Sequence, residues 1–258
     1  MAKKRGISFS GIYLTLILII MYVPIVLVVI FSFNESKISS LWGGFSLNWY
    51  GELFRDRSMF EALRNSVVLG LLSSFSAAVI GTLAATGLTR YKLKSGKVME
   101  YFATLPIMIP EIIMGMVFLT FFSLLGLPFG MVTLVIAHTS FCIPYVFLMV
   151  KARLAGLDKS YVEAARDLGA SELRAFYDIT MPLAMPAIVS GMLLSFAMSF
   201  DDVIISVFVT GVNTNTLPMK IYSQIKTGVT PKTNALCALI FVVTIFLCAL
   251  SMRISKKK

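Results

Sequence analysis

Six long apolar segments constrain the fold of this chain more than any other feature of its sequence. They are predicted over residues 11–33, 65–88, 98–125, 128–150, 183–209 and 234–252. Each is long enough to cross the ~30 Å hydrocarbon core of a bilayer as a helix rising about 1.5 Å per residue. Lipid cannot satisfy an open backbone, and the segments are too continuous for barrel strands. The sequence therefore predicts an all-α membrane protein with a six-helix transmembrane domain over residues 11–252.

The basic residues that flank these segments predict the orientation of the chain. If the N-terminus lies inside, the inner segments hold 16 Lys and Arg residues and the outer segments hold 7. This bias favours an arrangement in which both termini are inside. It also explains the net charge of +10. Nucleic acid is not an expected partner, because no basic patch is interleaved with exposed aromatic residues.

Two segments between the spans stand out. The outer loop, 34–64, contains Trp42, Trp49, Tyr50 and Phe54 and is expected to hold a short helix at the membrane interface. The inner loop, 151–182, has five basic and five acidic residues. The general preference of basic residues for inner loops therefore does not explain its composition.

The inner loop is predicted to form two short helices. Ser160 and Glu163 have the spacing of a capping box, which predicts a helix start at about Tyr161. Gly169 is placed to end this helix, and Ser171 to cap a second one. The second helix is expected to stop at Met181–Pro182, before the fifth span. An apolar stripe on the first helix suits either an ordinary surface helix or a docking helix; it consists of Tyr161, Ala164 or Ala165, and Leu168.

The same loop resembles a signature of the permeases of bacterial ATP-binding-cassette importers. That signature is Glu-Ala-Ala, three residues, Gly, nine residues, Ile, one residue and Leu-Pro. This chain has Glu163, Ala164, Ala165, Gly169, Ile179 and Pro182 in that register, with Met181 in place of Leu. The resemblance implies a type I importer permease fold. It also implies that these six matching residues couple the chain to a cytosolic ATPase dimer through a coupling helix.

Further stretches resemble the second permease subunit of spermidine/putrescine importers. They are Tyr22–Ile25, Phe31–Asn34, Ser199–Val203, Phe208–Gly211 and Leu217–Ser223. The resemblance implies a non-catalytic, multi-pass subunit of the bacterial cytoplasmic membrane. Its implied partners are a homologous permease, the ATPase dimer and an external polyamine-binding protein. ATP and Mg²⁺ would be bound by the ATPase, with no cofactor in this chain and spermidine or putrescine as the cationic cargo.

Three acidic residues are candidates for the solute pathway. Glu111, Asp201 and Asp202 lie within apolar segments, where a carboxylate costs about 2.5–3.5 kcal/mol. Along straight helices Glu111 and Asp201 would lie at similar depths, about 20 Å from the inner side. A carboxylate-lined passage suits polyamine cations, and Phe196, Phe200 and Tyr145 could add cation–π contacts. Alternatively, the carboxylates bond to helix ends, backbone or the partner permease.

Other features of the apolar segments concern mainly packing. Pro106 and Pro110 should interrupt the third segment just before Glu111, where the freed carbonyls could line a water-filled cavity or the prolines could simply kink the helix. A small-residue face at Ala77, Gly81 and Ala85 favours close helix packing. The cysteines, Cys142, Cys237 and Cys248, are expected to be small apolar core residues, and no metal-binding spacing occurs. His138 is expected to be buried and hydrogen-bonded rather than catalytic.

Other functions remain open from the residues alone. The cargo could instead be a metal chelate, thiamine or an inorganic anion. An ion-coupled carrier is less expected, because the sequence shows no strong internal repeat. An intramembrane enzyme would need a nucleophile–base or metal-ligand set, which the sequence does not offer. The sequence contains no P-loop, so ATP would be hydrolysed by another chain.

Overall fold

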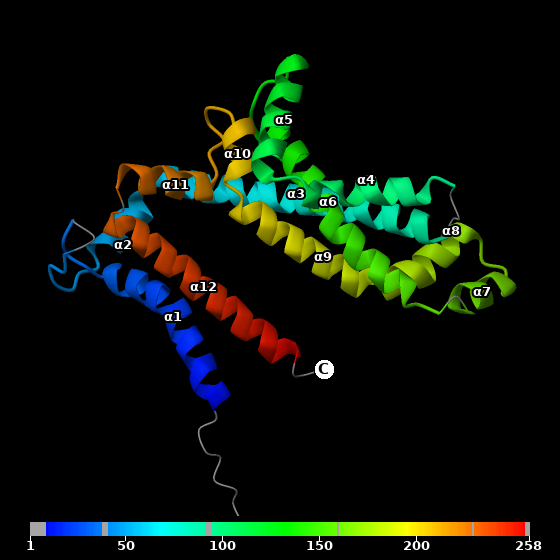
Figure 1. The fold of residues 1–258 in the computed structure, drawn as a ribbon, viewed down its shortest axis with the longest axis horizontal. Helices are drawn as coiled ribbons and strands as arrows, with labels where there is room; N and C mark the ends of the chain where they lie inside the picture. Colours follow the sequence, from blue (N-terminus) through cyan, green and yellow to red (C-terminus); the bar gives the residue numbers. More distant parts are fainter. Residues whose placement is uncertain (1–8, 38–40, 91–93, 159, 229, 256–258) are drawn as a thin grey trace, which may run out of the picture. The chain divides into compact units, whose positions relative to one another are not determined.

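The computed structural model describes residues 9–37, 41–90, 94–158, 160–228 and 230–255, and in these ranges the regular structure is helical (Figure 1). The described residues include one isolated β-bridge, between Asn34 and Phe45. The prediction of an all-α chain is therefore confirmed. The chain divides into two units, which are described separately: residues 1–59 with 221–258, and residues 60–220.

The second unit is built on three long helices, α3 (Arg57–Arg90), α6 (Met131–Ala155) and α9 (Met181–Asp201). A Cβ placed on Gly81 of α3 would lie 3.0 Å from the Val146 Cβ of α6, and a Cβ on Gly191 of α9 would lie 3.0 Å from the Val146 Cα. Larger residues at these two glycines would force the helices apart. The predicted small-residue face of α3 is confirmed, since Ala77 and Ala85 are buried as well.

The third apolar segment is broken rather than continuous. It forms α4 (Gly96–Met108) and α5 (Glu111–Leu124), whose axes differ by 107°. Pro110 restricts Ile109 to an extended conformation (φ −86°, ψ 130°), which ends α4. The predicted break is confirmed at Pro110, whereas Pro106 lies inside α4 and does not interrupt it. The depth expected for Glu111 along a straight helix is wrong, because the chain turns just before it.

The start of the fifth segment also differs from the prediction. α8 (Glu172–Ala175), a π-helical turn η1 (Phe176–Thr180) and α9 follow one another without a stop at Met181–Pro182. In η1 the Met181 N–H donates to the Phe176 carbonyl, five residues earlier. Pro182 lies in the first turn of α9, where a helix tolerates a missing N–H. The wider turn carries the chain past the proline instead of ending the helix.

The end of the fifth segment is interrupted as well. α9 ends at Asp201, and a separate short helix, α10 (Ile204–Val209), follows. Between the two helices the backbone is extended at Asp202 (φ −66°, ψ 130°) and returns toward the helical region at Val203 (φ −113°, ψ −39°). The expectation of one helix over 183–209 is therefore wrong. α10 packs on α5, where a Cβ added to Gly115 would lie 2.4 Å from Phe208.

Within the described ranges, four helical stretches are long and apolar enough to cross a membrane, and the bent pair α4–α5 makes up to five. The last helix, α12 (Pro231–Ser255), is apolar over the shorter stretch 231–246. Each predicted segment thus corresponds to a helix or a broken helix. Six membrane crossings stay a prediction.

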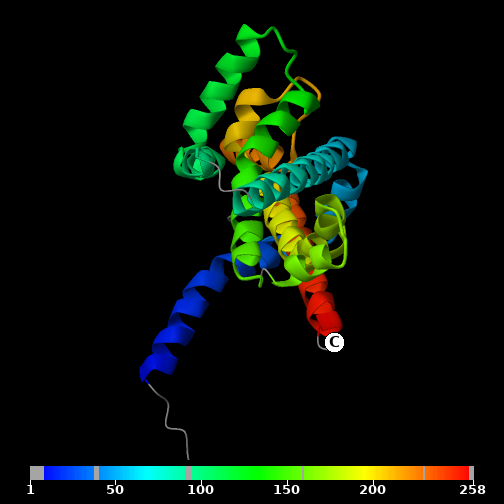
Figure 2. The same ribbon diagram turned by 90° about the vertical axis from the view of Figure 1, so that its right-hand side faces the viewer.

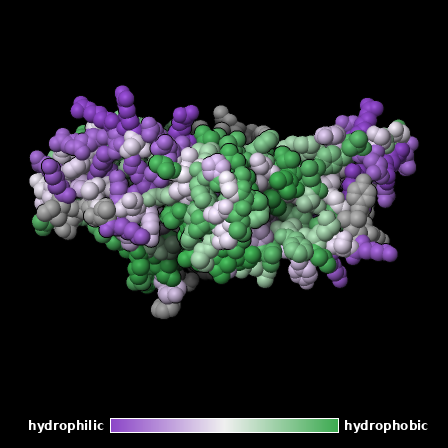
Figure 3. Space-filling model, turned by 90° about the horizontal axis from the view of Figure 1, so that it is seen from above, coloured by the Kyte–Doolittle hydropathy of each residue, from purple (hydrophilic) through white to green (hydrophobic). Residues whose placement is uncertain are grey.

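Hydrogen bonds at the two ends of the second unit show which loops lie together. At one end, the Arg90 Nη1 donates to the Glu172 carbonyl (3.5 Å), and the Arg153 Nε donates to the Leu183 carbonyl (3.0 Å). Hydrophilic side chains gather there, over α7 and α8, whereas a hydrophobic surface covers the middle of the unit (Figure 3).

At the other end, the Leu217 N–H donates to the Ser66 Oγ (2.8 Å), and the Asn65 Nδ2 donates to the Asn215 carbonyl (3.1 Å). Loops predicted to face the inside thus share one end of the unit, and the segments predicted to lie outside share the other.

The first unit contains α1 (Phe9–Phe31), α2 (Asn48–Arg55) and α12. α1 and α12 approach each other near α2 and then diverge (Figures 1 and 2). The predicted short helix of the outer loop is present as α2. The Trp49 Nε1 donates to the Asn34 carbonyl (2.7 Å), whereas Trp42 and Phe54 are exposed. α11 (Leu217–Thr227) joins the two units along the chain.

An ion pair fastens α12 to the end of α2 in this unit. The Lys232 Nζ donates to the Asp56 Oδ2 at 2.6 Å, and both side chains are mostly buried. This bond lowers the pKa of Asp56 to about 2. Asp56 is therefore ionised at neutral pH.

Candidate functional site

The predicted coupling helix is present as α7 (Ser160–Asp167). Gly169 has φ +87°, a conformation that favours glycine. The Gly169 N–H donates to the Arg166 carbonyl (2.9 Å), and the Ala170 N–H donates to the Ala165 carbonyl (3.0 Å). This bonding pattern satisfies the last carbonyls of α7, so the predicted helix end is confirmed.

The start of α7 differs from the predicted capping box. Among the described residues α7 begins at Ser160, whose N–H donates to the Asp158 Oδ1 (2.9 Å). Bonds from Ser160 lower the pKa of Asp158. Asp158 rather than Ser160 thus supplies the accepting side chain, and the expected helix start at about Tyr161 is confirmed. The cap of the second helix is confirmed, because the Ser171 Oγ accepts from the Arg174 N–H (3.3 Å).

The apolar stripe predicted for α7 is largely exposed, although Tyr161 also lines a cavity between α7 and the rest of its unit. Leu168 is 90 % exposed, and Tyr161 and Ala164 are exposed as well. Nearby on η1, Tyr177 is also exposed. This end of the unit is otherwise hydrophilic, so large exposed apolar side chains here indicate a surface suited to a partner (Figure 3).

A cavity of about 390 Å³ lies behind α7. It is lined by the ends of α3 and α6 together with α7, α8 and the start of α9, and both Glu163 and Ile179 contribute to the lining. An ion pair between Arg166 and Glu172 links α7 to α8 at this cavity. The structure thus brings two of the predicted coupling residues together. Ala164 lies on the exposed face of α7, Ala165 is half-buried, and Pro182 lies in the first turn of α9.

Glu111 is the first residue of α5, directly after the sharp bend. Its side chain is exposed, and it forms no ion pair or side-chain hydrogen bond with the described residues of the chain. The unpaired N–H groups of a helix start favour a carboxylate at this position. Glu111 thus presents a negative charge at the break of the third segment.

Asp201 and Asp202 occupy the break of the fifth segment and differ sharply. The Asp202 side chain is 4 % exposed and accepts hydrogen bonds at the start of α10: from the Ile205 N–H (3.2 Å), the Ser206 N–H (2.8 Å) and the Ser206 Oγ (2.8 Å). Asp201, one residue earlier, is exposed and has no such partner among the described residues. The alternative that a carboxylate bonds to a helix end holds for Asp202.

A buried polar cluster that the sequence did not predict surrounds Asp202. The His138 Nδ1 lies 2.8 Å from the Ser199 Oγ, and its Nε2 lies 3.1 Å from the Ser206 Oγ and 3.4 Å from the Asp202 Oδ2. The Ser73 Oγ of α3 lies 3.0 Å from the Ser199 Oγ. His138 is buried and hydrogen-bonded, as expected. One signal could have indicated polar contacts on this face of α9: Ser195 and Ser199 are four residues apart in an apolar helix, although the Ser195 Oγ donates to the Cys142 carbonyl and not to the cluster.

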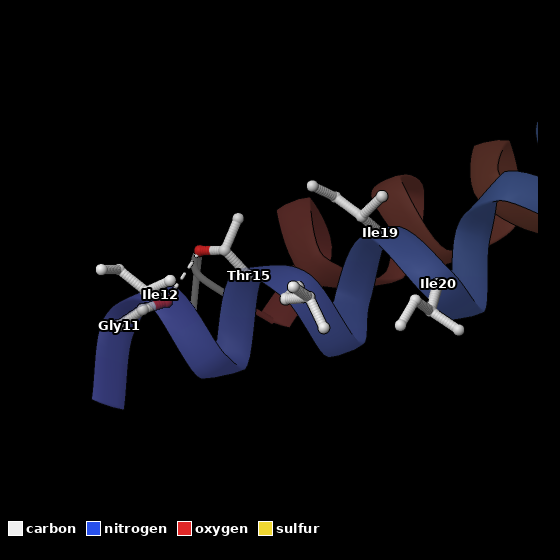
Figure 4. Close-up of a pocket in the computed structure, with 6 residues that line it drawn as sticks. Gly11, Ile12, Thr15, Ile19 and Ile20 are labelled. Carbon is white, nitrogen blue, oxygen red and sulfur yellow. Dashed lines mark hydrogen bonds between the residues drawn. The ribbon is translucent and has the colours of Figure 1, made fainter. Parts of the chain in front are cut away.

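The hollow beside α1 lacks the chemistry of a solute site (Figure 4). Five of its six lining residues offer no polar side-chain group: Gly11, Ile12, Leu16, Ile19 and Ile20. The sixth, Thr15, donates its hydroxyl to the Gly11 carbonyl (2.9 Å). Such a surface suits lipid or another apolar helix.

Comparison with known sequences identifies the family. Residues 77–257 match the family described as "Binding-protein-dependent transport system inner membrane component". The "Spermidine/putrescine transport system permease protein PotC" of Haemophilus influenzae is 40% identical over 237 residues, covering 92% of each chain. The protein of that name in Escherichia coli K12 is 38% identical, covering 98% of this chain and 96% of its own. The "Putrescine transport system permease protein PotI" of Escherichia coli K12 is 42% identical, covering 85% and 81%.

Solved structures show the same fold at low sequence identity. A bacterial transporter that imports the acidic polysaccharide alginate matches with a TM-score of 0.74 at 15% identity, covering 99% of each chain. The MetNI methionine transporter matches with a TM-score of 0.64 at 19% identity, covering 83% of this chain and 99% of its own. The predicted type I importer permease fold is confirmed. The chain belongs to the family of inner-membrane components of binding-protein-dependent transport systems.

Proposed function

We propose that this chain is a permease subunit of an ATP-driven importer of spermidine or putrescine. The observation that carries the proposal is the likeness to relatives named for polyamine transport, at 38–42% identity over 85–98% of this chain. The exposed carboxylates of Glu111 and Asp201 support it, because they sit at helix breaks in apolar segments and suit a cationic solute.

In this proposal energy enters through α7. The exposed stripe of Tyr161, Ala164 and Leu168 docks on a cytosolic ATPase subunit, which binds ATP and Mg²⁺ and hydrolyses the ATP. The ion pair from α7 to α8 passes the movement on, since α8 continues through η1 into α9. α9 ends at Asp201, so a pull on α7 reaches the carboxylate at the break.

The remaining partners complete the proposed machine. A homologous permease forms the other half of the passage, and an external polyamine-binding protein delivers the cargo. One solved structure that matches this chain with a TM-score of 0.73 is a bacterial alginate transporter in complex with a periplasmic protein, which is itself bound to an alginate pentasaccharide. Glu111 and Asp201 lie along the route, and cargo enters when the two permeases rock open to the outside. In this proposal both termini of the chain lie in the cytoplasm, as the bias of basic residues favours.

Uptake measurements in cells test the cargo. In bacteria that lack this chain, uptake of radiolabelled spermidine and putrescine should fall at least tenfold, and the full-length chain should restore it. Labelled thiamine and phosphate serve as control solutes, and their uptake should not change. Unchanged uptake of both polyamines, or loss of a control solute instead, would overturn the proposal.

A further inference from the structure

His138 links both halves of the broken fifth segment. It projects from α6, and its two ring nitrogens contact opposite sides of the break. The Nδ1 meets Ser199, near the end of α9, whereas the Nε2 meets Ser206 and Asp202 at the start of α10. A single rigid ring thus fixes the separation of the two helix ends.

The hydrogen bonds around the ring define which atoms donate. The one hydroxyl hydrogen of Ser206 goes to the Asp202 Oδ2 at 2.8 Å. The Ser206 Oγ can therefore only accept from the His138 Nε2, so the Nε2 carries a hydrogen that also points toward Asp202. The side chain of His138 is fully buried, and the carboxylate of Asp202 is nearly so. A buried carboxylate with these donors holds one position, because leaving them would leave a buried charge unpaired.

The position of Asp202 decides where Asp201 points. Asp202 turns inward to His138 and the start of α10, and Asp201, the last residue of α9, is left on the surface. Without the link to α6, the α9 and α10 ends could rotate and exchange the two side chains. Ser73 of α3 extends the link through Ser199, so three long helices hold the break.

We infer that His138 is a positioning residue: it holds the break between α9 and α10 so that Asp202 stays inside and Asp201 is presented to the solute. This inference rests on the proposed function, in which Asp201 lines the polyamine route. His138 itself does not touch the solute, since its side chain is fully buried.

A double-mutant cycle tests this role in cells that express the full-length chain in place of the native copy. The maximal rate of spermidine uptake is measured per membrane-inserted protein for His138→Asn, Asp201→Asn and the double variant. Each single change should lower the rate about tenfold, and the double variant should be no worse than either. Independent effects, which multiply to about a hundredfold, would overturn the inference, as would an unchanged rate in His138→Asn.

Two further variants guard against a simple folding defect. His138→Gln keeps an amide donor near the Nε2 position and should retain more uptake than His138→Asn, which keeps only the Nδ1 side. Equal uptake by the two would contradict the role assigned to the Nε2 bond.

Thr139→Val is the matched control: Thr139 is the next residue on α6, it is buried, and its hydroxyl has no partner within the described ranges. It should transport normally, and a defect as large as that of His138→Asn would also overturn the inference.

The cycle separates failure of the inference from failure of the proposed function. If Asp201→Asn transports spermidine at the normal rate, Asp201 does not line the route, and the proposed pathway fails. If Asp201→Asn is impaired and His138→Asn multiplies that defect, the pathway stands and His138 is not its positioning residue.

Discussion

The adjacent residues Asp201 and Asp202 show how strongly local geometry divides two identical side chains. A continuous helix would set them about 100° apart and leave the choice between them open. The break after Asp201 places one carboxylate on the surface, and the other caps α10 beside His138. The sequence indicated that a carboxylate in an apolar segment is energetically costly and therefore has a structural or functional role. It could not say which one had a partner, because His138 is more than sixty residues away along the chain.

Replacing each aspartate by asparagine should separate their roles in stability. Asp202→Asn removes a buried charge that accepts from two backbone N–H groups and one hydroxyl, so we expect a loss of about 1–2 kcal/mol in the free energy of unfolding. Asp201→Asn changes an exposed side chain and should unfold like the wild type. Thermal unfolding of the detergent-solubilised full-length protein measures both. A larger loss for Asp201→Asn would contradict the assignment.

At the scale of elements, α7 is the part most fully anticipated from the sequence. Its glycine end, its exposed stripe and the cap of the following helix are all local features, and local features are read directly from residue spacing. The wrong expectations concern places where tertiary packing supports an unusual backbone. Pro182 predicted a stop, but the π-helical turn η1 carries the chain past it into α9. The proline break before Glu111 was foreseen, whereas its 107° angle was not.

The end of α7 gives a prediction about coupling. Gly169→Val places a β-branched residue at φ +87°, which costs at least about 1–2 kcal/mol and should unwind the end of α7. We expect polyamine uptake to fall at least tenfold while the amount of protein in the membrane stays near normal. Gly156→Ala is the control, because Gly156 has φ −89° and the nearest atom to an added Cβ is 3.7 Å away. Normal uptake by Gly169→Val would show that α7 does not transmit the movement.

At the scale of the whole molecule, the second unit has two distinct ends. Loops that the basic residues predict to be inside share one end, and the predicted outer segments share the other. This arrangement is what alternating crossings by α3, α4–α5, α6 and α9–α10 require. The cavity behind α7 lies at the end that is predicted to be inside, and the break after Asp201 lies at the far end of α9, whose start lines the cavity.

Cysteine labelling tests this orientation. In a variant whose natural cysteines are replaced, Leu168→Cys and Val212→Cys each introduce one exposed thiol, at positions that are 90 % and 95 % exposed. A membrane-impermeant maleimide should label position 212 from outside the cell and position 168 only in inverted vesicles. The reverse pattern would mean that the termini lie outside. Labelling of both positions from one side would contradict the alternation.

The sequence by itself determined that the chain is helical and membrane-embedded and which loop carries the coupling signature. It also showed which acidic residues lie in apolar segments, where a carboxylate is energetically costly. Those conclusions follow from hydrophobicity, charge and short-range spacing, which act within a few turns of helix. Only the tertiary structure decided where the apolar segments break and which carboxylate is exposed. Those outcomes depend on a side chain of α6 meeting the ends of α9 and α10, and on glycines that let Val146 and Phe208 approach neighbouring helices. Contacts between residues that are distant in sequence leave no local pattern in the sequence, so only the tertiary structure reveals them.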